Sequence, residues 1–141
     1  LVVHGDFIIG LPGETPQTIE RTIEFAKGLD PETIQVSIAH AFPGTELYNY
    51  VTANGYFREN AEMTDQNGHQ LPHIEYPGLS REAMVGAVDR FYTQYYLRPR
   101  VLWRILRKVI FNSRERKRLT QEACEYLRLH SERMKFISNG K

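Results

Sequence analysis

The sequence contains a single cysteine, Cys124, among its 141 residues. One cysteine excludes an intrachain disulfide and any metal site built only from cysteines within these residues, and it is typical of a reducing compartment. The chain also lacks the run of roughly 18 apolar residues that a membrane-spanning helix needs. Its composition, 41% hydrophobic and 25% charged residues, is that of a globular domain. We therefore expect a cytoplasmic protein.

Basic residues are scarce in the first part of the chain. Residues 1–80 contain 3 basic and 11 acidic side chains, whereas residues 81–141 contain 15 basic and 6 acidic ones. Between Arg98 and Arg118 there are nine basic residues and a single acid, Glu115. The charge thus divides the chain into an acidic first part and a basic second part.

The first 55 residues alternate between strand and helix patterns. Residues 2–9 are rich in Val, Ile and Phe and predict a strand that is apolar on both faces toward its end. Thr15 and Pro16 predict a helix start, and Gly28 is expected to close that helix. Residues 34–41 predict a second strand, and Thr45 begins a helix that ends near residue 54. Strand, helix, strand, helix with short turns is typical of parallel β/α units, so the predicted class is α/β.

The remaining residues change from loop to helix. Residues 56–79 form a connecting loop in this interpretation, with a short strand at 73–76. Ser80 begins a first helix, Pro99 a second and Ser113 a third. The first of these helices has a contact stripe at helical spacing: Met84, Val88, Phe91 and Tyr95. We therefore expect two domains, residues 1–79 and residues 80–141.

Both predicted strands end in loops that contain glycine and proline, GLPGET at 10–15 and FPGTE at 42–46. Carboxyl ends of neighbouring parallel strands meet at one edge of a sheet, so these loops favour one shared ligand site. Glycine lets a flat group approach the backbone, and proline fixes the turn. Ordinary capped turns and the phosphate cradle of a β/α barrel enzyme are the alternatives. Residues 1–20 contain no lysine or arginine, which counts against phosphate.

The segments GDFIIGLPGETPQTI and IQVSIAHAFPGTELYNYV resemble the fifth and sixth strands of a radical S-adenosylmethionine (radical SAM) barrel. The resemblance implies an α/β fold made of the last two β/α units of a partial TIM-type barrel, followed by an α-helical C-terminal extension. It also implies that the chain is the C-terminal part of a longer enzyme. That enzyme would use SAM and a [4Fe-4S] cluster to generate a 5′-deoxyadenosyl radical.

The resemblance implies five contacts to the adenosyl group, at the two strand ends: Ile8, Gly10, Pro12, Ala39 and His40. Ile8 would pack against adenine and Gly10 would leave room for it, while backbone groups after Ala39 and His40 would bind the base edge. His40 and Phe42 would face the substrate; the alternative for His40 is a histidine hydrogen-bonded to the neighbouring backbone. No residue is implied as catalytic or as a metal ligand, because the three cluster cysteines would lie upstream of Leu1. The segment alone is therefore expected to be inactive.

The segment from residue 70 to residue 119 resembles one subgroup of radical SAM proteins. It is similar to the tail of bacterial radical SAM proteins with an N-terminal cobalamin-binding domain, most closely the group encoded with hopanoid biosynthesis genes. This implies a small-molecule or lipid substrate, a hopanoid side chain in particular, and cobalamin where the group uses it.

The sequence of residues 99–118 does not determine what the C-terminal extension contacts. The helix after Pro99 carries aliphatic side chains on one face and basic ones on the other, with Trp103 between them. Docking on the barrel with solvated arginines is the simpler interpretation. Contact with an anionic bilayer is the alternative, at about 1 kcal/mol per basic residue, and would place the protein at the inner face of the membrane. A non-catalytic module that binds a membrane or a partner would need only this tail. Nucleic acid is not expected, because aromatic residues do not interleave with the basic ones.

Three other features are expected to be structural. His69, His73 and Glu75 fit no standard zinc spacing and predict a polar loop. Cys124 is expected to be an inert, packed thiol. The tyrosines of the helix that begins at Ser80 are expected in the core or at an interface: Tyr92, Tyr95 and Tyr96.

Overall fold

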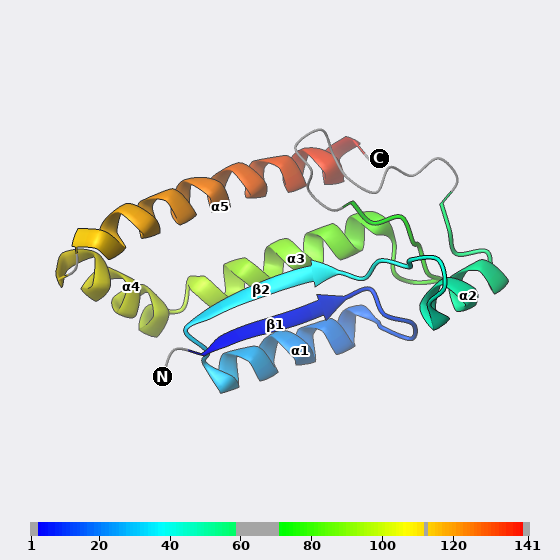
Figure 1. Ribbon diagram of the computed structural model, residues 1–141, viewed down its shortest axis with the longest axis horizontal. Coiled ribbons are helices and arrows are strands. Elements are labelled where there is room, and N and C mark those ends of the chain that lie inside the picture. Colours follow the sequence, from blue (N-terminus) through cyan, green and yellow to red (C-terminus); the bar gives the residue numbers. More distant parts are fainter. Residues whose placement is uncertain (1–2, 59–70, 112, 140–141) are drawn as a thin grey trace.

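The computed structural model describes residues 3–58, 71–111 and 113–139. Strands β1 (His4–Ile9) and β2 (Thr33–Ile38) are parallel and are connected by helix α1 (Pro16–Leu29). Helix α2 (Glu46–Ala53) follows β2, and the second part of the chain forms α3 (Arg81–Tyr96), α4 (Pro99–Phe111) and α5 (Ser113–Asn139). Both strands point toward α2, while α4 lies at the opposite end of the sheet (Figure 1). The predicted order of strands and helices is confirmed, and the partial barrel stays a prediction.

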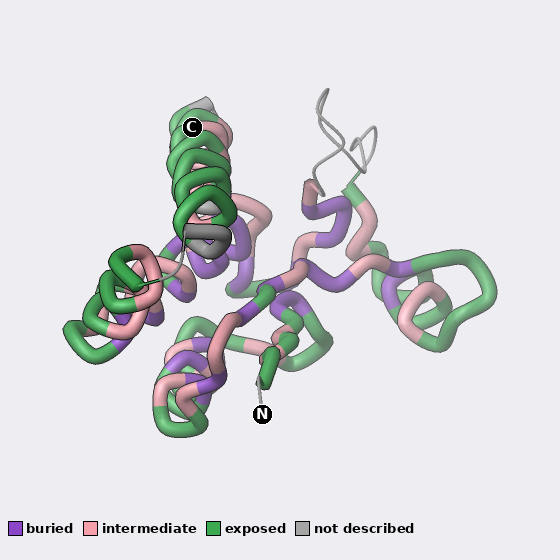
Figure 2. The backbone as a smooth tube through the Cα atoms, turned by 60° about the vertical axis from the view of Figure 1, so that its left-hand side comes forward, coloured by how far each residue is buried: buried purple, intermediate pink, exposed green. Residues whose placement is uncertain are grey.

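The two faces of the sheet differ in burial. The residues that face α1 and α3 include the buried side chains Ile9, Ile34, Val36 and Ile38. On the other face Ile8 is 53% exposed although Ile9, next to it, is 1% exposed. The prediction that β1 is buried on both faces toward its end is therefore wrong, because no described element covers the second face. Figure 2 shows buried residues gathered where the strands and helices face one another.

Helix α1 begins as predicted and ends differently. The Thr15 hydroxyl accepts a hydrogen bond from the N–H of Thr18, and the Thr18 hydroxyl accepts one from the N–H of Thr15. The prediction that Gly28 closes the helix is wrong, because Asp30 takes the left-handed conformation (φ 47°) and its N–H closes the last turn. The Asp30 carboxylate lies 2.9 Å from the guanidinium of Arg98, a contact that holds this uncommon conformation.

Helix α3 packs against the edge of β2 that faces away from β1. Its predicted stripe is confirmed, since all four members are buried. The Tyr92 hydroxyl accepts a hydrogen bond from the N–H of Val36 at 3.0 Å, and the Tyr96 hydroxyl accepts one from the N–H of Ile34 at 3.1 Å. The N–H groups of alternate residues, such as Ala39, point to β1 instead. The tyrosines are thus interface residues, as predicted, and they cover the backbone of an edge strand.

Helices α4 and α5 extend from this core. Of the α4 residues, only Val101 is buried. Helix α5 joins α3 through His130, whose Nδ1 lies 2.7 Å from the buried carboxylate of Asp89. Cys124 on α5 is exposed, so the prediction of a packed thiol is wrong. Among the residues that the structure describes, no helix is long and apolar enough to span a bilayer.

Candidate functional site

The loops that follow β1 and β2 lie side by side at the carboxyl end of the sheet. The N–H of Ala39 donates to the carbonyl of Ile9 at 2.7 Å, so strand pairing continues to the point where both loops start. A Cβ built on Gly10 would lie 3.8 Å from the backbone nitrogen of Ala39. The two glycine-proline loops therefore share one edge, as parallel strands require.

Gly10 allows a close approach of helix α3 to the first loop. Its φ is +90°, and a Cβ built on it would lie 3.1 Å from the sulfur of Met84. The space that the missing side chain leaves is thus occupied by Met84. A flat ligand at this loop would have to lie on the other side of the backbone, next to Ile8.

Glu14 folds back over its own loop. Its Oε2 accepts a hydrogen bond from the N–H of Gly10 at 2.5 Å, and its N–H donates to the carbonyl of Leu11 at 3.1 Å. Burial raises the pKa of the Glu14 carboxyl, although the Gly10 hydrogen bond acts in the opposite direction. The carboxylate therefore closes the turn, a contact that sequence reasoning missed. The four-residue spacing from Gly10 was the available signal.

Two histidines meet beyond the end of β2. The ring centroids of His40 and His73 are 4.6 Å apart, and His73 is 3% exposed. The Nε2 of His73 accepts a hydrogen bond from the N–H of Ala41 at 3.2 Å. Burial lowers the pKa of both rings from the ordinary value of 6.5, so both are neutral at pH 7. The His40 Nε2 and the His73 Nδ1 are buried without a hydrogen-bond partner in the described structure.

His73 is held in place by a short antiparallel contact with residues 57–58, a pairing partner that sequence reasoning did not predict. The N–H of Arg58 donates to the carbonyl of His73 at 3.1 Å, and the ring of Phe57 stacks on the His73 ring at 5.7 Å. The predicted short strand at 73–76 corresponds to this contact, but the expected polar loop is wrong for His73. The apolar neighbours of His73 in the sequence, Pro72 and Ile74, were the available signal. His69 lies outside the described residues.

Tyr76 adds a third unpartnered polar atom at this end of the sheet. Its hydroxyl is buried and has no hydrogen-bond partner among the described residues. Burial raises the pKa of Tyr76 to about 12, and the carboxylate of Glu14 adds to the shift. The hydroxyl is therefore protonated at neutral pH and can donate a hydrogen bond.

The remaining predicted contacts lie at the surface of the same edge. Ile8 is 53% exposed and Phe42 is 56% exposed, with the ring of Phe42 stacked 6.0 Å from that of His40. Pro12 is exposed in the first loop. Ala39 is buried, and its N–H is used in the sheet. The N–H of Ala41 is also used, so the predicted backbone contacts to a base edge would have to use the N–H of His40 or carbonyl oxygens.

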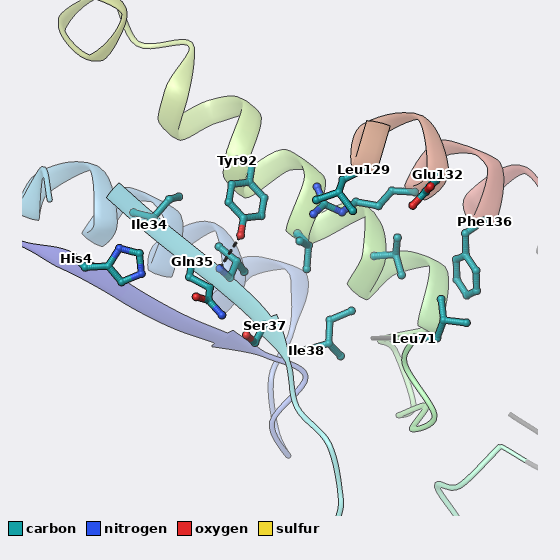
Figure 3. Close-up of a pocket in the computed structure, with 14 residues that line it drawn as sticks. His4, Ile34, Gln35, Ser37, Ile38, Leu71, Tyr92, Leu129, Glu132 and Phe136 are labelled. Atoms are coloured by element: carbon teal, nitrogen blue, oxygen red, sulfur yellow. Dashed lines mark hydrogen bonds between the residues drawn. The ribbon is translucent and has the colours of Figure 1, made fainter. Parts of the chain in front are cut away.

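One cavity among the described residues is a feature distinct from the strand exits. It has a volume of about 540 Å³ and lies between β2, α3 and α5 (Figure 3). Its lining includes Gln35, Tyr92 and Phe136, and none of the residues predicted at the strand exits. Within the described ranges no group of three or more His, Cys, Asp or Glu side chains is arranged to hold a metal ion. The strand exits and this groove are thus separate surfaces.

Comparisons with known proteins give one informative similarity. No family model matches the sequence, and no solved structure matches it. Among curated proteins, the chain is similar to an uncharacterized methyltransferase of Pyrococcus horikoshii, with 35% identity over 102 residues. These residues make up 70% of this chain and 21% of the relative. The matched part therefore spans about a fifth of that protein.

Proposed function

We propose that the chain is the C-terminal part of a radical SAM enzyme and that its two strand exits form part of the SAM site. The observation that carries the proposal is the placement of both glycine-proline loops at the carboxyl ends of adjacent parallel strands. Ligands of β/α folds bind at this edge. Similarity to a methyltransferase supports the coarser part of the proposal, an enzyme that uses SAM.

The groups at the strand exits suit an adenosyl group. The exposed side chains of Ile8 and Phe42 offer apolar surface for a flat ring. The Nε2 of His40 and the hydroxyl of Tyr76 are buried and have no partner among the described residues, so they would bond to polar atoms of the base or the ribose once ligand binding exposed them. A neutral His40 imidazole offers a donor and an acceptor without a net charge.

The residues of this chain would bind and orient, and they would not carry the redox chemistry. When bound, SAM and a [4Fe-4S] cluster would supply radical chemistry to the full-length enzyme. The single cysteine of this chain cannot provide the three thiolates that such a cluster needs. We therefore assign the cluster, and cobalamin where it is used, to residues outside this chain.

The proposal extends to the substrate through the resemblance of residues 70–119. It assigns a hopanoid lipid side chain as the substrate, with His40 and Phe42 on the substrate side of the SAM site. The exposed face of Phe42 offers the apolar contact that such a side chain would need.

A phosphate cradle at the same loops is less well supported. A phosphate would need the N–H groups of the first loop, and the carboxylate of Glu14 already accepts the N–H of Gly10. A carboxylate at this position would also repel the phosphate. No lysine or arginine occurs among residues 1–20 to offset that repulsion.

The experiment that tests the proposal is anaerobic reconstitution of the full-length protein, followed by measurement of SAM binding and of SAM cleavage on reduction. We expect Ile8→Glu to weaken SAM binding on the order of tenfold or more, because it places a charge against the apolar face of adenine. Phe25→Glu is the matched control, since Phe25 is 62% exposed on α1, away from the strand exits. A reconstituted protein that neither binds nor cleaves SAM would show the proposal to be wrong.

A further inference from the structure

Helix α4 is attached through one side to the segment before β2, and it also contacts α3 and α5. Arg104 lies 3.3 Å from the carboxylate of Asp30 and donates to the carbonyl of Pro31 at 3.1 Å. Lys108, one helical turn later, pairs with Glu32. These contacts fix the rotation of α4 about its axis, so its opposite side points away from the sheet.

The opposite side carries an exposed apolar stripe. Its members, which we call the α4 stripe, are 46%, 66%, 48% and 63% exposed in chain order: Leu102, Trp103, Leu106 and Ile110. Four residues spaced in this way fall within an arc of about 100° on a helix. Three large aliphatic side chains and an indole, each about half exposed or more, therefore lie on one face of α4.

Basic side chains border the α4 stripe on the side of Trp103. Arg100 is 82% exposed at its side chain. Arg107 is exposed, and it has no acidic partner within the part of the chain that the structure describes. A shallow depression of about 320 Å³ runs along this border, lined by four cations and the indole: Arg100, Trp103, Arg104, Arg107 and Lys108. The depression would accept anionic groups such as phosphates.

We propose that the α4 stripe docks on the surface of an anionic phospholipid bilayer. The stripe would enter the upper acyl region, and the basic border would lie against the lipid phosphates. Trp103 sits between the two, where an indole is favoured at a membrane interface. An acidic protein surface would match the charges as well, but the position of the indole at the border between apolar and basic side chains favours lipid. Because α4 is too short to span, it would lie in the plane of the interface.

The docking surface is remote from the strand exits. Asp30 and Glu32, which hold α4, immediately precede β2, whereas the loops of the candidate site follow the two strands. Six residues of strand separate these ends by about 20 Å. Contact of α4 with a bilayer would therefore anchor the protein and would not deliver a lipid directly to the strand exits. This inference is independent of the proposed SAM site.

The test measures binding of the full chain to vesicles. Trp103 is the only tryptophan of the chain, so its emission reports on this surface alone. We expect a shift to shorter wavelength, together with co-sedimentation, on vesicles of phosphatidylcholine and phosphatidylglycerol. Leu106→Glu and Arg107→Glu should each weaken binding on the order of tenfold, and high salt should do the same. The matched controls Leu127→Glu on α5 and Arg21→Glu on α1, both exposed positions, should leave binding unchanged.

Four results would overturn the inference. The first is an unmodified chain that does not bind anionic vesicles, and the second is Leu106→Glu binding as well as the unmodified chain. The third is an equal emission shift with sn-glycerol 3-phosphate alone, which would indicate a site for small anions. The fourth is a dimer that Leu106→Glu dissociates, without any vesicle binding, which would show that a second copy covers the stripe.

Discussion

The hydroxyl of Tyr92 accepts a hydrogen bond from the N–H of Val36 on the edge of β2 that faces away from β1. Tyr96 makes the same contact to Ile34, one turn later on α3 and two residues earlier on β2. An exposed strand edge is a template for pairing with other chains. Two hydroxyls from one helix cover this edge, so the sheet can be extended only beside β1. Such an arrangement suits the proposal that β2 is the last strand of a partial barrel.

Removing both hydroxyls should destabilise the protein and expose this edge. The double variant Tyr92→Phe, Tyr96→Phe leaves two N–H groups without their acceptors, at about 1–3 kcal/mol for each buried one. We expect a lower free energy of unfolding in urea and more light scattering on warming. Tyr50→Phe is the control, because Tyr50 is 43% exposed. A double variant as stable and as soluble as the control would contradict the assigned role of the two hydroxyls.

His73 should matter for stability through its acceptor atom. His73→Phe keeps an aromatic ring beside Phe57 but leaves the N–H of Ala41 without the acceptor that it has at 3.2 Å. We expect a loss of about 1–3 kcal/mol in the free energy of unfolding. His73→Gln, whose side-chain oxygen can replace Nε2, should lose less. Equal losses in the two variants would show that ring packing, and not the hydrogen bond, determines the effect.

Burial of the histidine pair predicts a pH dependence with a definite sign. The pKa values of His40 and His73 are lowered from 6.5 in the folded state, so the unfolded chain binds more protons below that pH. Stability should therefore be constant above about pH 7 and fall as the pH drops through 6.5 and below. Urea unfolding between pH 5 and pH 8 measures this dependence.

Glu14 changes the stability in the opposite direction at lower pH, so its contribution must be separated from that of the histidines. Its pKa is raised from 4.5 by burial, so its protonated form stabilises the fold and that contribution is lost as the pH rises above 4.5. His73→Phe removes one histidine and leaves Glu14 in place. The variant should thus show a smaller loss of stability between pH 7 and pH 5 than the unmodified chain. An unchanged slope would mean that the histidines do not titrate in this range.

Local sequence signals predicted the helices and strands. The features that they did not predict depend on contacts between residues far apart in the sequence. Thr15 and Ser80 cap α1 and α3 as predicted, because an N-cap depends on residues within one turn. The end of α1 depends on Arg98, which holds Asp30 from 68 positions away. The helix propensities of the residues around Gly28 do not predict that contact.

In the candidate site, too, the features set by local signals were predicted and those set by distant residues were not. The shared edge of the two loops follows from parallel pairing, which alternation of strand and helix predicts. The contact between half-buried His40 and buried His73 does not follow from it, since the segment around His73 reaches β2 through pairing with residues 56–58. The sequence did not predict which side of α4 faces outward either. Ion pairs with Asp30 and Glu32 determine which face of this amphipathic helix turns inward.

Two glycines offer a matched test of the first loop. Gly10 has φ +90°, and a Cβ there would meet the sulfur of Met84 at 3.1 Å, whereas a Cβ on Gly28 would meet nothing within 4 Å. Gly10→Ala should therefore lower the free energy of unfolding by about 1–3 kcal/mol through backbone strain and crowding. Gly28→Ala, in the last turn of α1, should raise it by about 0.4–1 kcal/mol, since alanine restricts the unfolded chain and favours the helix. Thermal and urea unfolding of the two variants compare the same chemical change at a strained and an unstrained position.

If Gly10→Ala were as stable as Gly28→Ala, the close approach of α3 to this loop would not limit the residue at position 10. The loop would then be free to move away from Met84 and toward a ligand.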